Sequence, residues 1–236
     1  MIPLPITYFE LETIYTQTVA QGVKSLAVTA ATEREGVSTV AYALAKRCEA
    51  GGRRTLLVDL NMARPSIASR LALTPTSWSL GDKSARDAIV RFPGSRTAVL
   101  TASGQASTSI RAREREYVSR SIADWLEEFD TVIVDAPAVN SSEHKHIPAE
   151  TVCAACDATV LVVLAGRVAE ASIKTAIERL TGAGARVAGS VFNDQFNPRL
   201  ADELCRETRR LDGILPRLMA RARNMIRQSD LLNYPI

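Results

Sequence analysis

The segment from residue 29 to residue 39 is the part of the sequence best suited to chemistry. It reads Thr-Ala-Ala-Thr-Glu-Arg-Glu-Gly-Val-Ser-Thr and connects an apolar run to a helical pattern. Backbone N–H groups in such a loop, at the positive end of the helix that follows, can hold a phosphate. The candidate phosphate-binding residues are Thr32, Glu35, Gly36, Val37, Ser38 and Thr39.

This loop matches only half of the phosphate-loop pattern GxxxxGK[ST]. Gly36 and Ser38 agree with it, whereas Ala31 replaces the first glycine and Val37 replaces the lysine. The missing charge-assisted hydrogen bond is worth about 1.5–3 kcal/mol. Losing a transition-state donor slows catalysis on the order of 100- to 1000-fold. The alternative is an ordinary strand-to-helix turn in which Ser38 caps the helix.

Two acidic residues follow apolar runs that are typical of buried strands. Asp59 comes after 55–58, and Asp135 comes after 131–134. Ligands of parallel sheets bind at the carboxyl ends of the strands. With Ser38, the two carboxylates therefore predict a Mg²⁺ site and a vestigial or weak catalytic site. They could instead be exposed strand-end carboxylates that bind nothing.

The alternation of apolar runs and helical patterns predicts an α/β fold with a doubly wound, mostly parallel sheet. We expect one domain over residues 1–236. The expected strands are 26–29, 55–58, 98–101, 131–134, 158–164 and 187–192, and the expected helices are 38–49, 119–129, 169–180, 200–211 and 216–229. The polar stretches 74–95 and 104–109 predict loops or a small subdomain.

Composition excludes some classes of function. The net charge of +3 and the 5% aromatic content do not favour a nucleic-acid partner. No apolar run approaches the roughly 20 residues that span a bilayer. The first residues lack the basic segment of a signal peptide, so we expect a cytoplasmic protein.

Several motifs together resemble one family. Asp59-Leu-Asn-Met-Ala-Arg-Pro65, Asp135-Ala-Pro137 and Gly189-Ser-Val-Phe-Asn193 follow one another as in the cytoplasmic domain of bacterial polysaccharide-associated tyrosine autokinases, which are relatives of the Min and Par ATPases. The resemblance implies a P-loop fold that binds ATP or ADP with Mg²⁺, with Arg64 among the nucleotide-binding residues and Asn193 at the base. It also implies a membrane polysaccharide co-polymerase of the chain-length-determinant type as partner, and a possible homo-oligomer.

The sequence also departs from that family. Glu33 places a negative charge where glycine or proline is usual, Asn61 replaces an acidic residue, and Ala63 replaces an arginine. Tyr234 stands alone where the kinases have a tyrosine cluster. We therefore expect a degenerate pseudokinase that regulates or scaffolds exopolysaccharide or capsule biosynthesis, with weak or absent ATP hydrolysis. The alternatives are an active ATPase or tyrosine kinase, with Arg34 supplying the missing charge, and a Min- or Par-like positioning ATPase.

Both ends of the sequence are candidate docking segments. Residues 1–22 carry Tyr8, Phe9, Ile14 and Tyr15, which suit a hydrophobic contact. Residues 200–230 predict basic amphipathic helices, of the kind found on membrane surfaces. These helices could bind at the inner membrane, or they could be ordinary surface helices packed by their apolar side.

Overall fold

The computed structural model describes residues 4–5, 7–141, 147–195, 204–205, 207–209 and 216–229. Contacts divide the chain into two compact units, residues 1–193 and 194–236. Each unit is described by itself, and the single domain expected from the sequence stays a prediction.

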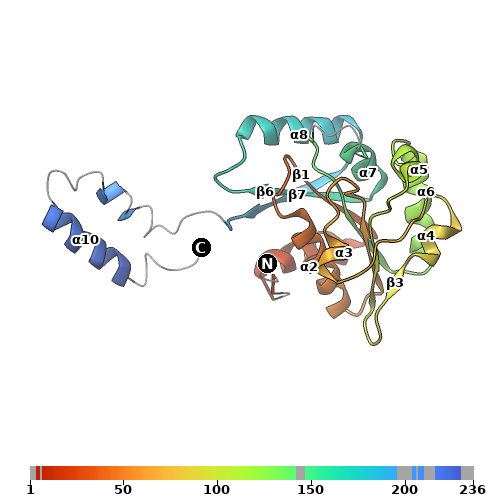
Figure 1. The fold of residues 1–236 in the computed structure, drawn as a ribbon, viewed down its shortest axis with the longest axis horizontal. Helices are drawn as coiled ribbons and strands as arrows, with labels where there is room; N and C mark the ends of the chain where they lie inside the picture. Colours follow the sequence, from red (N-terminus) through yellow and green to blue (C-terminus); the bar gives the residue numbers. More distant parts are fainter. Residues whose placement is uncertain are drawn as a thin grey trace. The chain divides into compact units, whose positions relative to one another are not determined.

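The first unit is built on a seven-stranded sheet with the order β3-β4-β2-β5-β1-β6-β7. All neighbouring strands are parallel except the β3–β4 pair. The expected doubly wound, mostly parallel sheet is confirmed (Figure 1). The strands are β1 (Ser25–Ala30), β2 (Thr55–Asp59), β3 (Val90–Arg91), β4 (Thr97–Leu100), β5 (Thr131–Asp135), β6 (Ala158–Leu164) and β7 (Val187–Asn193).

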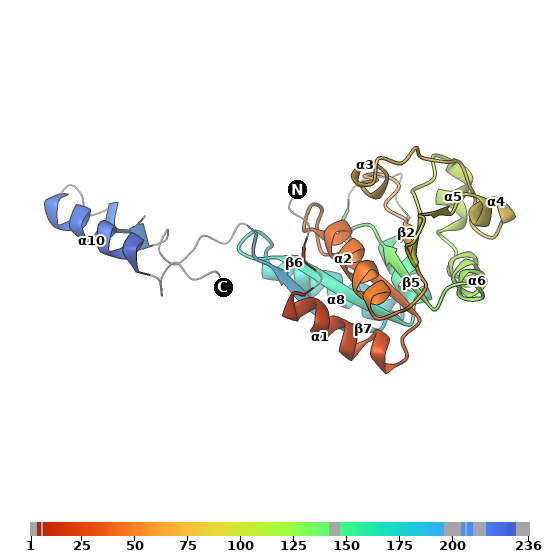
Figure 2. The ribbon, with the colours of Figure 1, turned by 90° about the horizontal axis from the view of Figure 1, so that it is seen from below.

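Helices cover both faces of this sheet. On one face, α1 (Phe9–Gln17) packs on α2 (Val37–Ala50), and α2 packs on the central strands (Figure 2). The other face carries α6 (Arg115–Leu126), α7 (Ala149–Ala155) and α8 (Glu170–Gly182). Every residue of β1, β2, β5 and β6 is buried, as expected for strands covered on both sides.

The remaining elements are short. They are the 3₁₀ turn η1 (Val19–Gln21), α3 (Ile67–Arg70), α4 (Lys83–Asp87) and α5 (Ala106–Arg111). Of the two stretches expected to form loops or a small subdomain, 74–95 contains α4 and β3, and 104–109 contains the start of α5. The expected helix 119–129 is shifted, since α6 occupies Arg115–Leu126. The sequence patterns did not predict α7 or the two-residue strand β3.

The helix α1 is fixed to α2 by one apolar contact area and one ion pair. Leu11 and Ile14 are buried. The carboxylate of Glu12 accepts hydrogen bonds from Nε (2.6 Å) and Nη2 (2.9 Å) of Arg47. Of the apolar side chains expected to dock a partner, Ile14 is therefore unavailable, whereas Phe9 is 78% exposed.

The second unit contains α10 (Pro216–Gln228), in agreement with the expected helix 216–229. Residues 204–205 and 207–209 are helical, and the rest of the expected helix 200–211 lies outside the described residues. No helix among the described residues is both long and apolar enough to cross a membrane.

Glu49 links the end of α2 to the start of β4. Its Oε1 accepts hydrogen bonds from Ser95 Oγ (2.7 Å) and from the backbone N–H of Arg96 (2.8 Å). Its Oε2 accepts hydrogen bonds from Thr97 Oγ1 (2.9 Å) and from Lys46. Burial would raise the pKa of Glu49, but these hydrogen bonds outweigh it and lower the pKa to about 2.

We predict that Glu49→Gln lowers the free energy of unfolding by about 1–3 kcal/mol at pH 7, because four donors lose a charged acceptor. Since the folded-state pKa lies below the unfolded value of about 4.3, this contribution is present above pH 5 and disappears toward pH 2. Urea unfolding across this range measures it. The control Glu127→Gln alters a surface carboxylate that is 68% exposed and should have little effect. A pH-independent difference would contradict the assignment.

Candidate functional site

The phosphate-loop candidate lies between β1 and α2, at the carboxyl edge of the sheet. Gly36 is the N-cap of α2 with φ +102°, and no side chain caps the helix. Ser38 lies in the first turn, so the interpretation of Ser38 as an ordinary helix cap is wrong. An added Cβ at Gly36 would lie 2.6 Å from Nδ2 of Asn193, so this position requires glycine.

Glu35 holds the loop from the inside. It is buried, and its carboxylate accepts hydrogen bonds from the backbone N–H and Oγ1 of Thr32 and from the backbone N–H of Leu164 (2.9 Å). The loop is thereby tied to the end of β6. The side chains of Thr32 and Glu35, both expected at a phosphate, bond to each other.

Asn193, at the end of β7, also reaches the loop. Its Nδ2 donates a hydrogen bond to the carbonyl oxygen of Glu35 at 2.9 Å. The structure therefore brings together two segments that are more than 150 residues apart in the chain. Contact of Asn193 with a nucleotide base stays a prediction.

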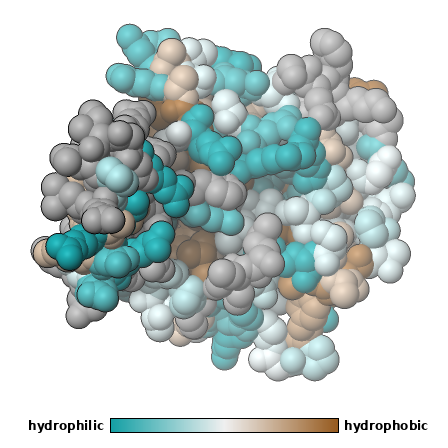
Figure 3. All heavy atoms as spheres, turned by 60° about the vertical axis from the view of Figure 1, so that its left-hand side comes forward, coloured by the Kyte–Doolittle hydropathy of each residue, from teal (hydrophilic) through white to brown (hydrophobic). Residues whose placement is uncertain are grey.

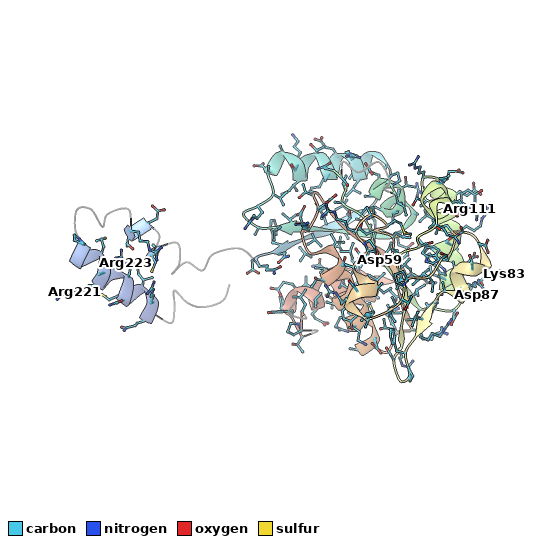
Figure 4. All side chains as sticks on the ribbon, viewed as in Figure 1. Asp59, Lys83, Asp87, Arg111, Arg221 and Arg223 are labelled. Carbon is cyan, nitrogen blue, oxygen red and sulfur yellow. The ribbon has the colours of Figure 1, made fainter. Side chains whose placement is uncertain are left out.

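Asp59 and Asp135 lie side by side, because they are register partners at the tips of β2 and β5. Both are fully buried, so the interpretation as exposed strand-end carboxylates is wrong. Asp59 accepts hydrogen bonds from the backbone N–H groups of Asn61 (3.0 Å), Ser66 (3.3 Å) and Ile67 (3.3 Å). Figure 4 shows Asp59 inside the first unit. Neither carboxylate oxygen of Asp135 has a hydrogen-bond partner among the described residues.

The pKa values of both carboxylates are raised. Burial raises the pKa of Asp59 to about 6, although three backbone N–H groups oppose the shift. Burial and the neighbouring charge of Asp59 together raise the pKa of Asp135 well above its usual value. The nearby hydroxyl of Ser38, although outside hydrogen-bond geometry, and the positive charge of Arg70 oppose this rise in part. A pair of buried like charges of this kind favours binding of either a proton or a cation.

The residues present fit a magnesium ion. Mg²⁺ is usually held by one or two carboxylates together with waters and substrate phosphates. The unpartnered oxygens of Asp135, with Asp59 and the hydroxyl of Ser38, provide such a donor set. Among the described residues, no cluster of three or more His, Cys, Asp or Glu side chains could form an all-protein metal site. The donor set thus suits an ion that arrives with a phosphate ligand.

Val37 occupies the position at which the phosphate-loop pattern has lysine. Val37 is half-buried and packs against the apolar cluster beneath α2. Arg34, considered as a substitute, is exposed on the loop with φ +66°. A different arginine reaches the start of α2, since Nη2 of Arg70 donates a hydrogen bond to Oγ1 of Thr39 at 2.8 Å. Sequence reasoning missed Arg70, because no motif marks its position on α3.

Arg64 lies beside the loop and is paired with it. Its Nε is 2.8 Å from Oε2 of Glu33. The other carboxylate oxygen of Glu33, Oε1, accepts a hydrogen bond from Ser141 Oγ at 2.9 Å. Arg64 was expected near phosphates, and the structure places it at this edge of the sheet. The sequence identified Glu33 as an unusual negative charge in the loop, but its contacts with Arg64 and Ser141 could not be predicted from local patterns.

Comparison with known proteins agrees with this geometry, although no family model matches the chain. The tyrosine-protein kinase CpsD of Streptococcus agalactiae is 26% identical over 175 residues, which cover 72% of this chain and 75% of CpsD.

Two solved structures show the same fold. The kinase domain of the Escherichia coli tyrosine kinase ETK has a TM-score of 0.66 and 20% identity, and the match covers 77% of this chain and 71% of that one. The septum site-determining protein MinD of Pyrococcus horikoshii, solved with Mg-ADP, has a TM-score of 0.60 and 18% identity, covering 74% and 72%. The chain is thus a homologue of the tyrosine-protein kinase CpsD, with the P-loop fold that bacterial tyrosine kinase domains share with MinD.

Proposed function

We propose that this protein binds Mg-nucleotide weakly and acts as a pseudokinase, a regulator or scaffold in exopolysaccharide or capsule biosynthesis. The observation that carries the proposal is the combination of an apolar Val37 at the lysine position with the buried Asp59–Asp135 pair. The two buried carboxylates favour binding of a cation. The loop, however, lacks the lysine that would stabilise the transition state of phosphoryl transfer. Turnover is then slow or absent.

An active ATPase or tyrosine kinase is the second candidate, and Arg70 is the observation that favours it. Its guanidinium reaches Thr39 at the start of α2, so a cation is present near the first turn of the helix. An arginine carries the same charge as lysine and can bind phosphate in a bidentate manner. Steady-state ATP hydrolysis, or stoichiometric phosphotyrosine on the chain after incubation with ATP, would select this candidate.

We propose the cytoplasmic side of the inner membrane as its place of action, with a membrane polysaccharide co-polymerase as partner. This rests on the resemblance to polysaccharide-associated kinases and on α10, which carries four arginines and no acidic residue. On the face drawn in Figure 3, hydrophobic residues form small separate patches among hydrophilic ones.

The first prediction from this proposal concerns the missing lysine. Mg-ATP and Mg-ADP should bind with a Kd above about 100 μM, because about 1.5–3 kcal/mol of phosphate contact is absent. Val37→Lys should tighten binding about ten-fold or more, as measured by isothermal titration calorimetry. Thr16→Lys, which adds the same charge at an exposed position of α1, should leave the affinity unchanged. Submicromolar affinity of the wild type would contradict the proposal.

The second prediction concerns the buried carboxylates. Asp135→Asn should raise the free energy of unfolding by about 1–3 kcal/mol at pH 8 without Mg²⁺, because it removes a buried charge that lacks a hydrogen-bond partner. The raised folded-state pKa implies that ionisation costs stability above the unfolded value of about 3.9. Millimolar Mg²⁺ with ADP should stabilise the wild type and not the variant in thermal unfolding. Equal responses would show that Asp135 does not hold the ion.

The third prediction concerns α10, on which Figure 4 marks Arg221 and Arg223. Replacing Arg221, Arg223 and Arg227 with glutamate should strongly reduce sedimentation with anionic vesicles, since each basic residue contributes about 1 kcal/mol near a charged surface. The control triple variant of Lys83, Arg113 and Lys174, all exposed in the first unit, changes net charge equally. If both triple variants behave alike, net charge rather than α10 governs binding.

A further inference from the structure

Glu33 is the acidic residue of the phosphate loop that contacts the loops after β2 and β5. Its Oε2 pairs with Nε of Arg64 at 2.8 Å, and its Oε1 accepts a hydrogen bond from Ser141 Oγ at 2.9 Å. Arg64 follows β2 and Ser141 follows β5, so one carboxylate connects three loops at the carboxyl edge of the sheet. Backbone bonds from Val139 and Asn140 to Ala30 and Ala31 hold the third loop beside the first.

The position of Arg64 is set by its own loop as well as by Glu33. The backbone N–H of Arg64 donates to both the carbonyl oxygen and Oδ1 of Asn61, each at 3.2 Å. The turn that contains Arg64 is further fixed by the bond from the Asn61 N–H to Asp59. The guanidinium is thereby held at the edge where the carboxylate pair lies, and it neutralises an acidic side chain of the loop.

A contact of this kind contributes little to folding. The side chain of Glu33 is 27% exposed and that of Arg64 is 41% exposed, and ion pairs at such exposure stabilise proteins only slightly. Its electrostatic effect on the loop is larger, because an anion bound to the loop would lie close to the negative charge of Glu33. An anionic ligand and Glu33 would also both be attracted to the same guanidinium.

We infer that Glu33 is a specificity-determining residue of the phosphate loop, an internal anion that competes with an incoming nucleotide phosphate for Arg64. This inference rests on the proposed nucleotide binding. Binding of a phosphate replaces the Glu33–Arg64 ion pair with a phosphate–Arg64 pair. Only a charged ligand makes this exchange, because an uncharged one does not compete with the carboxylate for the guanidinium. Glu33 therefore selects against di- and triphosphates and is indifferent to an uncharged nucleoside.

The test removes the charge of Glu33 and leaves its shape. Glu33→Gln should bind Mg-ADP about ten-fold more tightly than the wild type in calorimetric titration, and should bind adenosine with unchanged affinity. Glu33→Asp, the matched control, retains the charge and should show no gain with Mg-ADP. The gain should fall to less than two-fold when Arg64→Gln is added to Glu33→Gln, because the released guanidinium is its source. Glu33→Ala repeats the comparison if Glu33→Gln does not fold in thermal unfolding measurements.

The outcomes separate this inference from the proposed function. If Val37→Lys binds Mg-ADP but Glu33→Gln and Glu33→Ala bind it no better than the wild type, the inference is wrong and nucleotide binding stands. A full gain that persists without Arg64 would also overturn the competition, since repulsion alone would then explain it. If no variant binds Mg-ADP, Val37→Lys included, the proposed nucleotide site is wrong and the inference is lost with it.

Discussion

The burial of two adjacent carboxylates at the centre of a parallel sheet is the constraint on which the site depends. Asp59 satisfies its charge locally, and the three backbone N–H groups that it accepts determine the path of the chain after β2 and the start of α3. Asp135 has no such partners among the described residues. The stability of the loop region therefore depends on what neutralises Asp135, and the position of α3 depends on Asp59 remaining an acceptor. The same two side chains that influence folding at this edge of the sheet are thus the ones proposed to hold a cation.

The apolar runs predicted the buried strands within one or two residues, because a strand covered on both faces needs apolar residues at every position. The same runs located Asp59 and Asp135 at the strand tips, and the loop pattern identified Val37. Contacts between distant side chains were not predictable from local patterns. The bond of Glu35 to the end of β6, the pair formed by Glu33 and Arg64, and the reach of Arg70 to Thr39 each join separate loops. The short helices α5 and α7 were also not predicted, because they show no strong apolar periodicity. Helices of this length depend on tertiary packing.

The phosphate loop is held in place by the protein itself. Glu35 accepts hydrogen bonds from Thr32 and Leu164, and Glu33 bonds to Arg64 and Ser141. Two carboxylates of the loop thus accept hydrogen bonds from other groups of the protein. A loop built in this way does not require a phosphate in order to keep its conformation. The hydrogen bonds of Glu33 and Glu35 can therefore preserve the fold of the loop in a chain without catalytic activity. This agrees with a chain that is homologous to a kinase but lacks the lysine.

Asn193 contacts the phosphate loop and is also the last residue of the first unit. Its side chain donates to Glu35 and leaves no room for a Cβ at Gly36, and its carbonyl oxygen accepts a hydrogen bond from the Ala165 N–H. The chain continues from it into the segment that carries α10. A displacement of the loop must move this residue or break its bonds. Asn193 therefore makes the conformation of the phosphate loop depend on the last residue of β7, although the two segments are more than 150 residues apart in the chain.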